Sequence, residues 1–88
     1  MEPKAKIRAK IAASNIRKLR EFRNYTQLYM AQKLGVSQNA YSKIELGYSK
    51  ICLEKLFLIA DALEVEDITL FLNGEEHVLF LRSDADTN

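Results

Sequence analysis

The segment TQLYMAQKLGVSQNAYSKIELG, residues 26–47, has the pattern of two short helices joined by a tight turn. Thr26 and Ser37 stand where an N-cap side chain accepts a hydrogen bond from the helix backbone. Between the two helices, Gly35 is the residue type that most readily takes a positive φ. Each helix has one apolar face at helical spacing, made by Met30, Ala31, Leu34, Tyr41 and Ile44. The pattern predicts a helix-turn-helix, whose second helix has the right size for the major groove of DNA.

The charge distribution along the chain indicates a polyanionic partner. Residues 1–50 contain eleven Lys and Arg residues against three Asp and Glu residues, whereas residues 51–88 contain two against nine. The net charge of the whole chain, +1, hides this asymmetry. Solvated helix faces would be the plainer explanation, but the basic half coincides with the helix-turn-helix, which favours a surface that faces nucleic acid.

The composition excludes several classes of protein. With 88 residues the chain can form one small domain. The single cysteine, Cys52, cannot form an intrachain disulfide and is expected to be a structural, semi-buried thiol, and His77 stands alone, so we expect no metal and no cofactor. No apolar run approaches the ~20 residues of a membrane span and no signal-peptide core is present, so we expect a cytoplasmic protein without membrane association. No phosphate loop, nucleophile elbow or paired-acid motif appears, so we predict no enzyme.

Apolar periodicity outside the helix-turn-helix predicts three further helices and hence an all-α fold. The first helix begins near residue 4 and ends near residue 24, unless Ser14–Asn15 caps a shorter helix that begins near residue 15. The middle pair spans about 27–34 and 38–46, a fourth helix begins at Leu53, and a short fifth helix opens at Glu66–Asp67. The apolar faces of the first and fourth helices include Ile7, Ile11, Ile16, Leu19, Phe22, Leu53, Leu56, Phe57, Ile59, Ala60 and Leu63.

The tail after Asn73–Gly74 differs from the rest of the chain. Its β-prone run predicts a strand, and a lone strand cannot satisfy its backbone within one small helical domain. We therefore expect it to pair with its twin in a second chain, through Val78, Leu79, Phe80 and Leu81. The expected organisation is a basic helical extension over residues 1–14, a DNA-binding domain over 15–73, and a dimerisation or partner tail over 74–88 with its last residues disordered.

Several motifs of residues 16–72 occur in one register. They are Ile-Arg-x-Leu-Arg at 16–20, Thr26–Gln27, Ala31, Leu34-Gly35-Val36-Ser37, Ser42-Lys43-Ile44-Glu45 with Gly47, and the apolar series of the fourth helix. In these motifs the chain resembles the Cro/C1-type (Xre) helix-turn-helix family of phage repressors and bacterial regulators. The resemblance implies a five-helix, lambda-repressor-like DNA-binding domain, here with an N-terminal helical extension and a short C-terminal segment for dimerisation.

The first turns of the second helix of the motif are predicted to read bases, because N-terminal residues of a recognition helix reach base edges. The amides of Gln38 and Asn39 can each form two hydrogen bonds with adenine N6 and N7. Lys43, one turn further, can reach guanine O6 and N7 or a phosphate, and Ser42 shares the exposed face. Tyr41 is expected in the core, with its hydroxyl near the surface.

Further residues are predicted to contact the DNA backbone. Gln27 begins the first helix of the motif, where its amide and the helix N-terminus can meet a phosphate oxygen, as the matching glutamine does in family members. The loop after the recognition helix is expected to follow the backbone. The predicted backbone contacts are Gln27, Ser37, Tyr48, Ser49, Lys50, Arg17 and Arg23, of which the last two could equally be plain surface charges.

The resemblance also implies an ion pair between Arg20 and Glu45, which links the first helix to the recognition helix in phage repressors. Losing one partner of such a buried pair typically costs ~3–5 kcal/mol, so Glu45 is interpreted as an orienting residue rather than a catalytic acid. Two departures from the family are notable. Ile51 and Cys52 replace the usual Pro and Ser or Thr before the fourth helix, and Leu28 and Tyr29 replace acids, where they could pack on the N-terminal extension or bind a partner.

These features together predict a transcriptional repressor that binds double-stranded DNA as a homodimer on a palindromic operator. An antitoxin-like or controller protein is the alternative, with the same DNA surface and a protein partner bound by its acidic C-terminal half. A third interpretation is an interaction module that has kept the fold and lost DNA binding. The basic N-terminal half and the polar recognition positions argue against that third interpretation.

Overall fold

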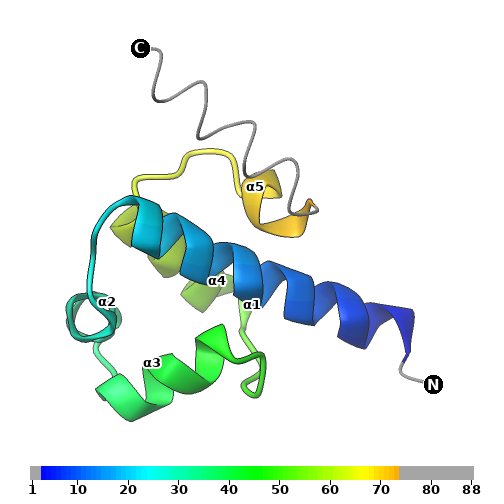
Figure 1. The fold of residues 1–88 in the computed structure, drawn as a ribbon, viewed down its shortest axis with the longest axis horizontal. Coiled ribbons are helices and arrows are strands. Elements are labelled where there is room, and N and C mark those ends of the chain that lie inside the picture. Colours follow the sequence, from blue (N-terminus) through cyan, green and yellow to red (C-terminus); the bar gives the residue numbers. More distant parts are fainter. Residues whose placement is uncertain (1–2, 74–88) are drawn as a thin grey trace.

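The computed structural model describes residues 3–73 and consists there of five helices. They are α1 (Lys4–Phe22), α2 (Gln27–Leu34), α3 (Gln38–Glu45), α4 (Leu53–Ala62) and α5 (Thr69–Leu72), arranged as Figure 1 shows. The all-α fold is thus the predicted one. The tail with Val78, Leu79, Phe80 and Leu81 lies outside the described residues, as does His77. None of the helices described is long and apolar enough to cross a membrane.

The helix-turn-helix forms through the local interactions that its sequence predicts. The Thr26 hydroxyl accepts a hydrogen bond from the Tyr29 amide at 3.0 Å, and the Ser37 hydroxyl accepts one from the Ala40 amide at 3.1 Å. Gly35 ends α2 in the left-handed conformation, with φ of 70°. These two caps and one turn set the angle between α2 and α3, so that both bury their apolar faces on the same core.

The first helix is a single helix of 19 residues, so the start near residue 4 is the correct one of the two predicted starts. Asn15 does not cap a helix. It is buried within α1, and its side-chain amide donates to the backbone carbonyls of Phe71, at 3.0 Å, and of Asn73. These bonds fasten α5 and the end of the described chain to the middle of α1.

The core lies where α1 packs against α3 and α5 and where α2 packs against α3 and α4. Its largest fully buried side chains are Tyr41, Phe71, Ile16, Met30, Ile59 and Leu63. Some residues of the predicted apolar faces lie outside the core, at two places. Ile7 and Ile11 are exposed because the N-terminal half of α1 extends past the other helices (Figure 1), and Leu53 and Phe57 are exposed on the outer side of α4.

Two further expectations about helix starts are corrected. Cys52 is the N-cap residue of α4 and forms no side-chain cap, as expected, but its thiol is exposed rather than semi-buried. The fifth helix begins at Thr69, not at Glu66–Asp67. Asp67 instead accepts hydrogen bonds from the amide and hydroxyl of Thr69, at 3.0 and 2.6 Å, and so supports the turn that precedes α5.

Candidate nucleic-acid interface

The recognition helix α3 has one buried and one open face. Tyr41, Ile44 and Glu45 are its buried residues, and they hold it against the core. The predicted base-reading residues lie on the other side, where Gln38, Asn39 and Lys43 are exposed and Ser42 is half-buried. The first two residues of α3, Gln38 and Asn39, are thus open to a ligand.

A bidentate ion pair fixes the C-terminal end of α3. Arg20 Nε donates to Glu45 Oε2 at 2.6 Å, and Arg20 Nη2 donates to Glu45 Oε1 at 3.1 Å. Arg20 Nη1 also donates to the carbonyl of Tyr25 at 2.8 Å, in the connection between α1 and α2. The side chains are 12% and 2% exposed, respectively, so solvent scarcely screens the pair. Arg20 and Glu45 thus form the predicted link between the first helix and the recognition helix.

Gln27 joins the same network from the start of α2. Its Nε2 donates to Glu45 Oε1 at 3.1 Å. An amide nitrogen carries two hydrogens, so one remains for a phosphate oxygen while the other holds the side chain in place. Burial by itself would raise the pKa of Glu45, but the Arg20 guanidinium, the nearby Tyr41 hydroxyl and the Gln27 amide together outweigh it and hold the pKa below its ordinary value. Glu45 therefore stays charged and orients three helices at once.

The expectation for Tyr41 was half wrong. Its ring is in the core, but its hydroxyl is buried as well, near the Glu45 carboxylate, and forms no hydrogen bond of ordinary geometry in the structure. Burial raises the pKa of Tyr41 far above its ordinary value. The hydroxyl is therefore a neutral group within the domain, not a surface donor.

The loop after α3 lies against the first helix. Gly47 has φ of 78°, and a Cβ placed on it would lie 3.3 Å from Lys10 Cγ and 3.8 Å from the Cβ of Ala13. This close approach holds the following residues beside α1, with Tyr48 75% exposed, Lys50 exposed and Ser49 half-buried. A groove of about 550 Å³ lies between the loop and α1, and Lys6 and Lys50 are the charged residues that line it.

The two arginines predicted at the backbone differ in their surroundings. Arg17 is exposed on α1. Arg23 Nε donates to the carbonyl of Leu63 at 3.0 Å, and its Nη1 lies 3.7 Å from Glu64 Oε2. Its guanidinium therefore joins the end of α1 to the end of α4, while 36% of the Arg23 side chain stays open to solvent.

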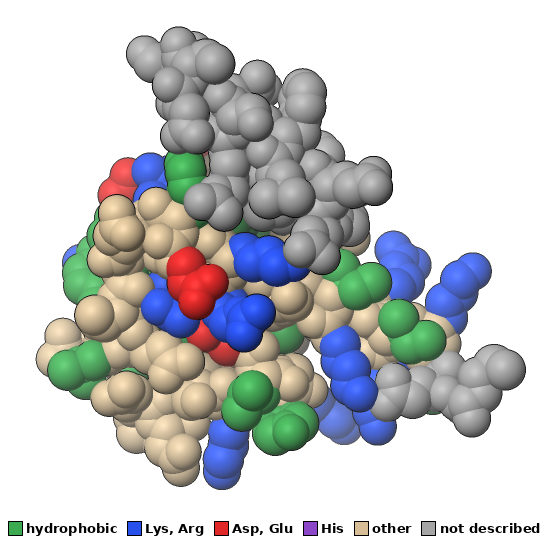
Figure 2. All heavy atoms as spheres, in the orientation of Figure 1, with side chains coloured by type: hydrophobic (Ala, Val, Ile, Leu, Met, Phe, Trp, Pro, Cys, Tyr) green, Lys and Arg blue, Asp and Glu red, His purple; other side chains and the backbone are tan. Residues whose placement is uncertain are grey.

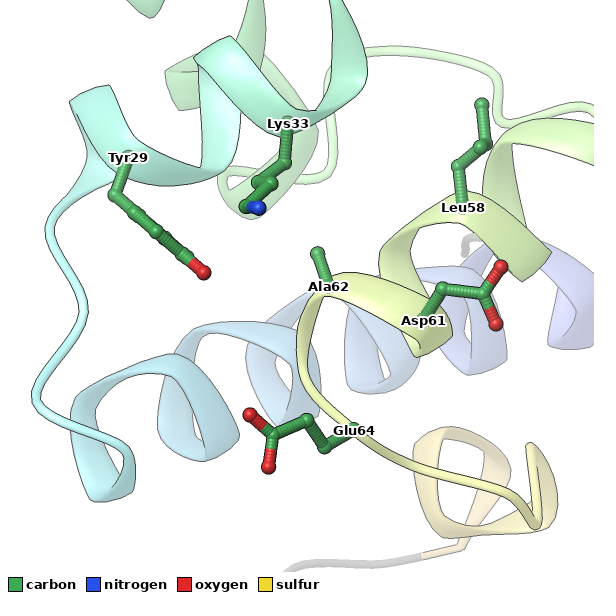
Figure 3. Close-up of a pocket in the computed structure, with 6 residues that line it drawn as sticks. All are labelled: Tyr29, Lys33, Leu58, Asp61, Ala62 and Glu64. Carbon is green, nitrogen blue, oxygen red and sulfur yellow. The ribbon is translucent and has the colours of Figure 1, made fainter.

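A second hollow, of about 300 Å³, lies between α2 and α4 (Figure 3). Lys33 faces it together with the acidic Asp61 and Glu64. Tyr29 also lines it, but the ring packs on Tyr25 with centroids 4.4 Å apart rather than on the N-terminal extension. One cation and two acids line this hollow, so it gives no field that would favour a polyanion.

The projecting half of α1 carries only basic charge on the face that Figure 2 shows. Lys and Arg side chains gather there, whereas over the rest of this face acidic side chains lie among further basic ones. Within residues 3–73 no group of three His, Cys, Asp or Glu residues could hold a metal ion. The groups that the site offers are thus amides, hydroxyls and cations, which suit the hydrogen-bond acceptors of nucleic acid.

Comparison with protein-family models gives a match to the family described as Helix-turn-helix over residues 16–70. The chain belongs to this family, in its Cro/C1-type (Xre) class of DNA-binding regulators. The match contains the Arg20–Glu45 pair, α2, α3 and the loop after α3, and it excludes residues 4–15 of α1. The chain matched no curated protein and no solved structure.

Proposed function

We propose that this regulator is a transcriptional repressor that acts in the cytoplasm as a homodimer, with one α3 in the major groove of each half of a palindromic operator. The observation that carries the proposal is the division of α3 into two faces. Glu45 and the buried residues hold one face to the core, and Gln38, Asn39 and Lys43 stand exposed on the other. A rigid helix with polar residues at its exposed N-terminal end is what base readout requires.

The exposed residues indicate which bases the helix prefers. Gln38 and Asn39 each present one donor and one acceptor, which pair with N6 and N7 of adenine. Lys43 can donate to O6 and N7 of guanine, and Ser42 can donate to or accept from either base. The proposed half-site therefore contains adenines read by the start of α3, next to a guanine or a phosphate within reach of Lys43.

Backbone contacts would position α3 in the groove. Gln27 is already held by Glu45 and keeps one amide hydrogen for a phosphate. The N-cap region of α3 adds Ser37, and the loop adds the exposed Tyr48 and Lys50 together with Ser49. Arg17 completes the set together with Arg23, whose guanidinium also joins α1 to α4 but stays partly open to solvent. Such contacts give affinity that falls steeply with salt.

The homodimer is proposed from the tail sequence Val78–Leu81 and from the logic of two-fold operators. Half-sites of a helix-turn-helix dimer lie about one helical turn apart, ~34 Å. The spacing of the two half-sites in an operator therefore tests directly whether the protein binds as a dimer.

Selection of bound duplexes from a random pool, with the full chain at moderate salt, tests the proposal. Enrichment of a palindrome with two equal half-sites about 10 base pairs apart supports a homodimeric regulator and identifies the operator. Enrichment of one unrepeated half-site supports sequence-specific binding and contradicts the dimer. Binding without enrichment contradicts sequence-specific regulation by α3.

A second candidate function has one observation in its favour. Leu53 and Phe57 expose apolar surface on α4, in the acidic half of the chain. An antitoxin-like or controller protein would use such a surface, with the tail, for a protein partner while α3 binds DNA. The test is size measurement of the purified chain alone and with the product of a neighbouring gene. A stable complex of unlike chains supports the second candidate, and a homodimer that ignores that product supports the first.

A further inference from the structure

Three cations lie along one side of α1. Lys6, Lys10 and Arg17 follow one another at intervals of four and seven residues, which places them on one side of a helix with 3.6 residues per turn. All three are exposed. They form what we call the basic stripe, and its two lysines precede residue 16, where the family match begins.

Contacts of neighbouring residues show which way the basic stripe faces. Ala13 and Arg20 continue the same series along the helix, at intervals of three and four residues. Ala13 and Lys10 adjoin Gly47 of the loop after α3, and Arg20 binds Glu45 of α3 itself. The basic stripe therefore lies on the side of α1 that is turned to the recognition helix and its loop.

The basic stripe also continues the set of predicted backbone contacts. Lys6 and Lys50 line the same groove, and none of the residues that line this groove is acidic. Lys50 belongs to the loop that is proposed to follow the DNA backbone. From Lys6 to Arg17 the helix rises about 16 Å, at 1.5 Å per residue, a length comparable with about five nucleotides along one strand.

We propose that the N-terminal extension of α1 is a second DNA-backbone contact, in which Lys6 and Lys10 bind phosphates of the duplex that flanks the half-site held by α3. The inference rests on the proposed DNA binding by α3 and extends it to a wider footprint. The partner is recognised through phosphates alone, so the extension adds affinity and salt dependence without sequence preference.

The opposite side of the extension provides a matched control. Lys4 and Arg8 are exposed cations on the same helix, and at helical spacing they share a side with Ile11 and Asn15. Asn15 binds the carbonyls of Phe71 and Asn73, so this side of α1 is turned to α5 and not to α3. Variants on the two sides change the net charge equally and differ in the direction that the lost charges face.

The experiment compares Lys6→Gln/Lys10→Gln with Lys4→Gln/Arg8→Gln in the full chain. Binding to a fluorescent random-sequence duplex of about four helical turns is measured at several salt concentrations between about 50 and 200 mM. Two lost phosphate contacts should reduce the slope of log K against log salt by about 1.8, and affinity at about 0.1 M salt by roughly tenfold per contact. The control pair should change the slope by less than about 0.5.

The outcomes separate this inference from the proposed function. Equal changes in the two pairs, or no change in either, overturn the inference, because then only total charge matters or the extension does not touch DNA. The single variant Lys6→Gln, which leaves the contact of Lys10 with Gly47 intact, should lower the slope by about 0.9 and guards against a folding defect in the double variant. If the wild-type protein binds duplex DNA without enriching any sequence, the proposed function is contradicted. The salt dependence of the variants can still be compared in that case, so the inference about the extension is tested separately.

Discussion

Arg20 and Glu45 connect the first helix to the last residue of the recognition helix through two hydrogen bonds, of 2.6 and 3.1 Å. The pair is nearly closed to solvent, and Gln27 shares one of the carboxylate oxygens. A buried pair of this kind is weak evidence for net stability, but it leaves an uncompensated charge when one partner is removed. The ion pair therefore fixes the orientation of α3 relative to α1. It also holds the Gln27 side chain in place at the start of α2.

Glu45→Gln should lower the free energy of unfolding by about 3–5 kcal/mol, because it leaves the Arg20 guanidinium without its counter-charge in a largely buried place. Urea denaturation followed by helical circular dichroism measures the change. Glu64→Gln is the control, since its ion pair with Arg23 is 3.7 Å long and the Glu64 side chain is 63% exposed, so it should cost less than about 1 kcal/mol. Equal losses in the two variants would mean that burial of the Arg20–Glu45 pair has no energetic consequence.

The same carboxylate should make stability depend on pH. The folded-state pKa of Glu45 lies below its ordinary value of 4.5, so its contribution is fully present above about pH 4.5 and is lost as the pH falls through the lower, folded value. Below that window both states are protonated at this residue and its contribution is gone. Denaturation midpoints of the wild type and of Glu45→Gln, taken from neutral to acid pH, should converge on the acid side. A constant difference at every pH would contradict the assigned pKa direction.

Tyr41→Phe should leave stability unchanged or raise it by up to about 1 kcal/mol. The hydroxyl lies near Glu45 but is buried without a hydrogen bond of ordinary geometry, so its removal takes away a desolvation cost and keeps the ring that fills the core. Thermal unfolding of the variant measures this, with Tyr41→Ala as the control, which should lose about 3–5 kcal/mol through the cavity it leaves. A loss above about 1 kcal/mol in the phenylalanine variant would show that the hydroxyl has a partner in solution.

Asn15→Ala should destabilise the protein by about 2–3 kcal/mol, because the carbonyls of Phe71 and Asn73 lose the amide that binds them. Asn15→Asp keeps the size of the side chain and replaces the donor by an acceptor, so it should cost at least as much. Chemical denaturation of both variants, with hydrogen exchange of the amides of α5, measures the effect. An aspartate variant as stable as the wild type would mean that shape, not hydrogen bonding, holds α5.

Local signals carried most of what could be predicted from the sequence. Thr26, Ser37 and Gly35 act on backbone groups within a few residues, so the two helix caps and the turn could be predicted from the sequence. The apolar periodicity of α2 and α3 likewise predicted which of their residues are buried. Contacts between residues far apart in the sequence could not be predicted in this way. Asn15 resembles a helix cap in sequence, and only the approach of Phe71, 56 residues further on, shows that it is a tether.

The same reasoning explains which parts of the candidate site were missed. Amphipathic spacing cannot tell where a helix leaves the core, so Ile7 and Ile11 were placed inside although α1 projects past the domain. Arg23 is a cation in a basic stretch of sequence, and its neighbours Leu63 and Glu64 come from the far end of α4. The direction of the basic stripe also depends on a tertiary contact, that of Lys10 with Gly47, which no local pattern reports.

Gln38→Ala/Asn39→Ala should abolish the preference for the selected operator over a scrambled duplex and leave folding intact. Both residues are exposed at the start of α3 and make no contribution to the core, so thermal stability should stay within about 0.5 kcal/mol of the wild type. Each bidentate base contact is worth about 1–3 kcal/mol of discrimination, so the ratio of the two affinities should fall by roughly 30-fold or more. Gln32→Ala, at an exposed position of α2 outside the proposed interface, is the matched control and should keep the ratio. Titration of operator and scrambled duplexes at one salt concentration measures it, and an unchanged ratio in the double variant would exclude these two amides as the base-reading residues.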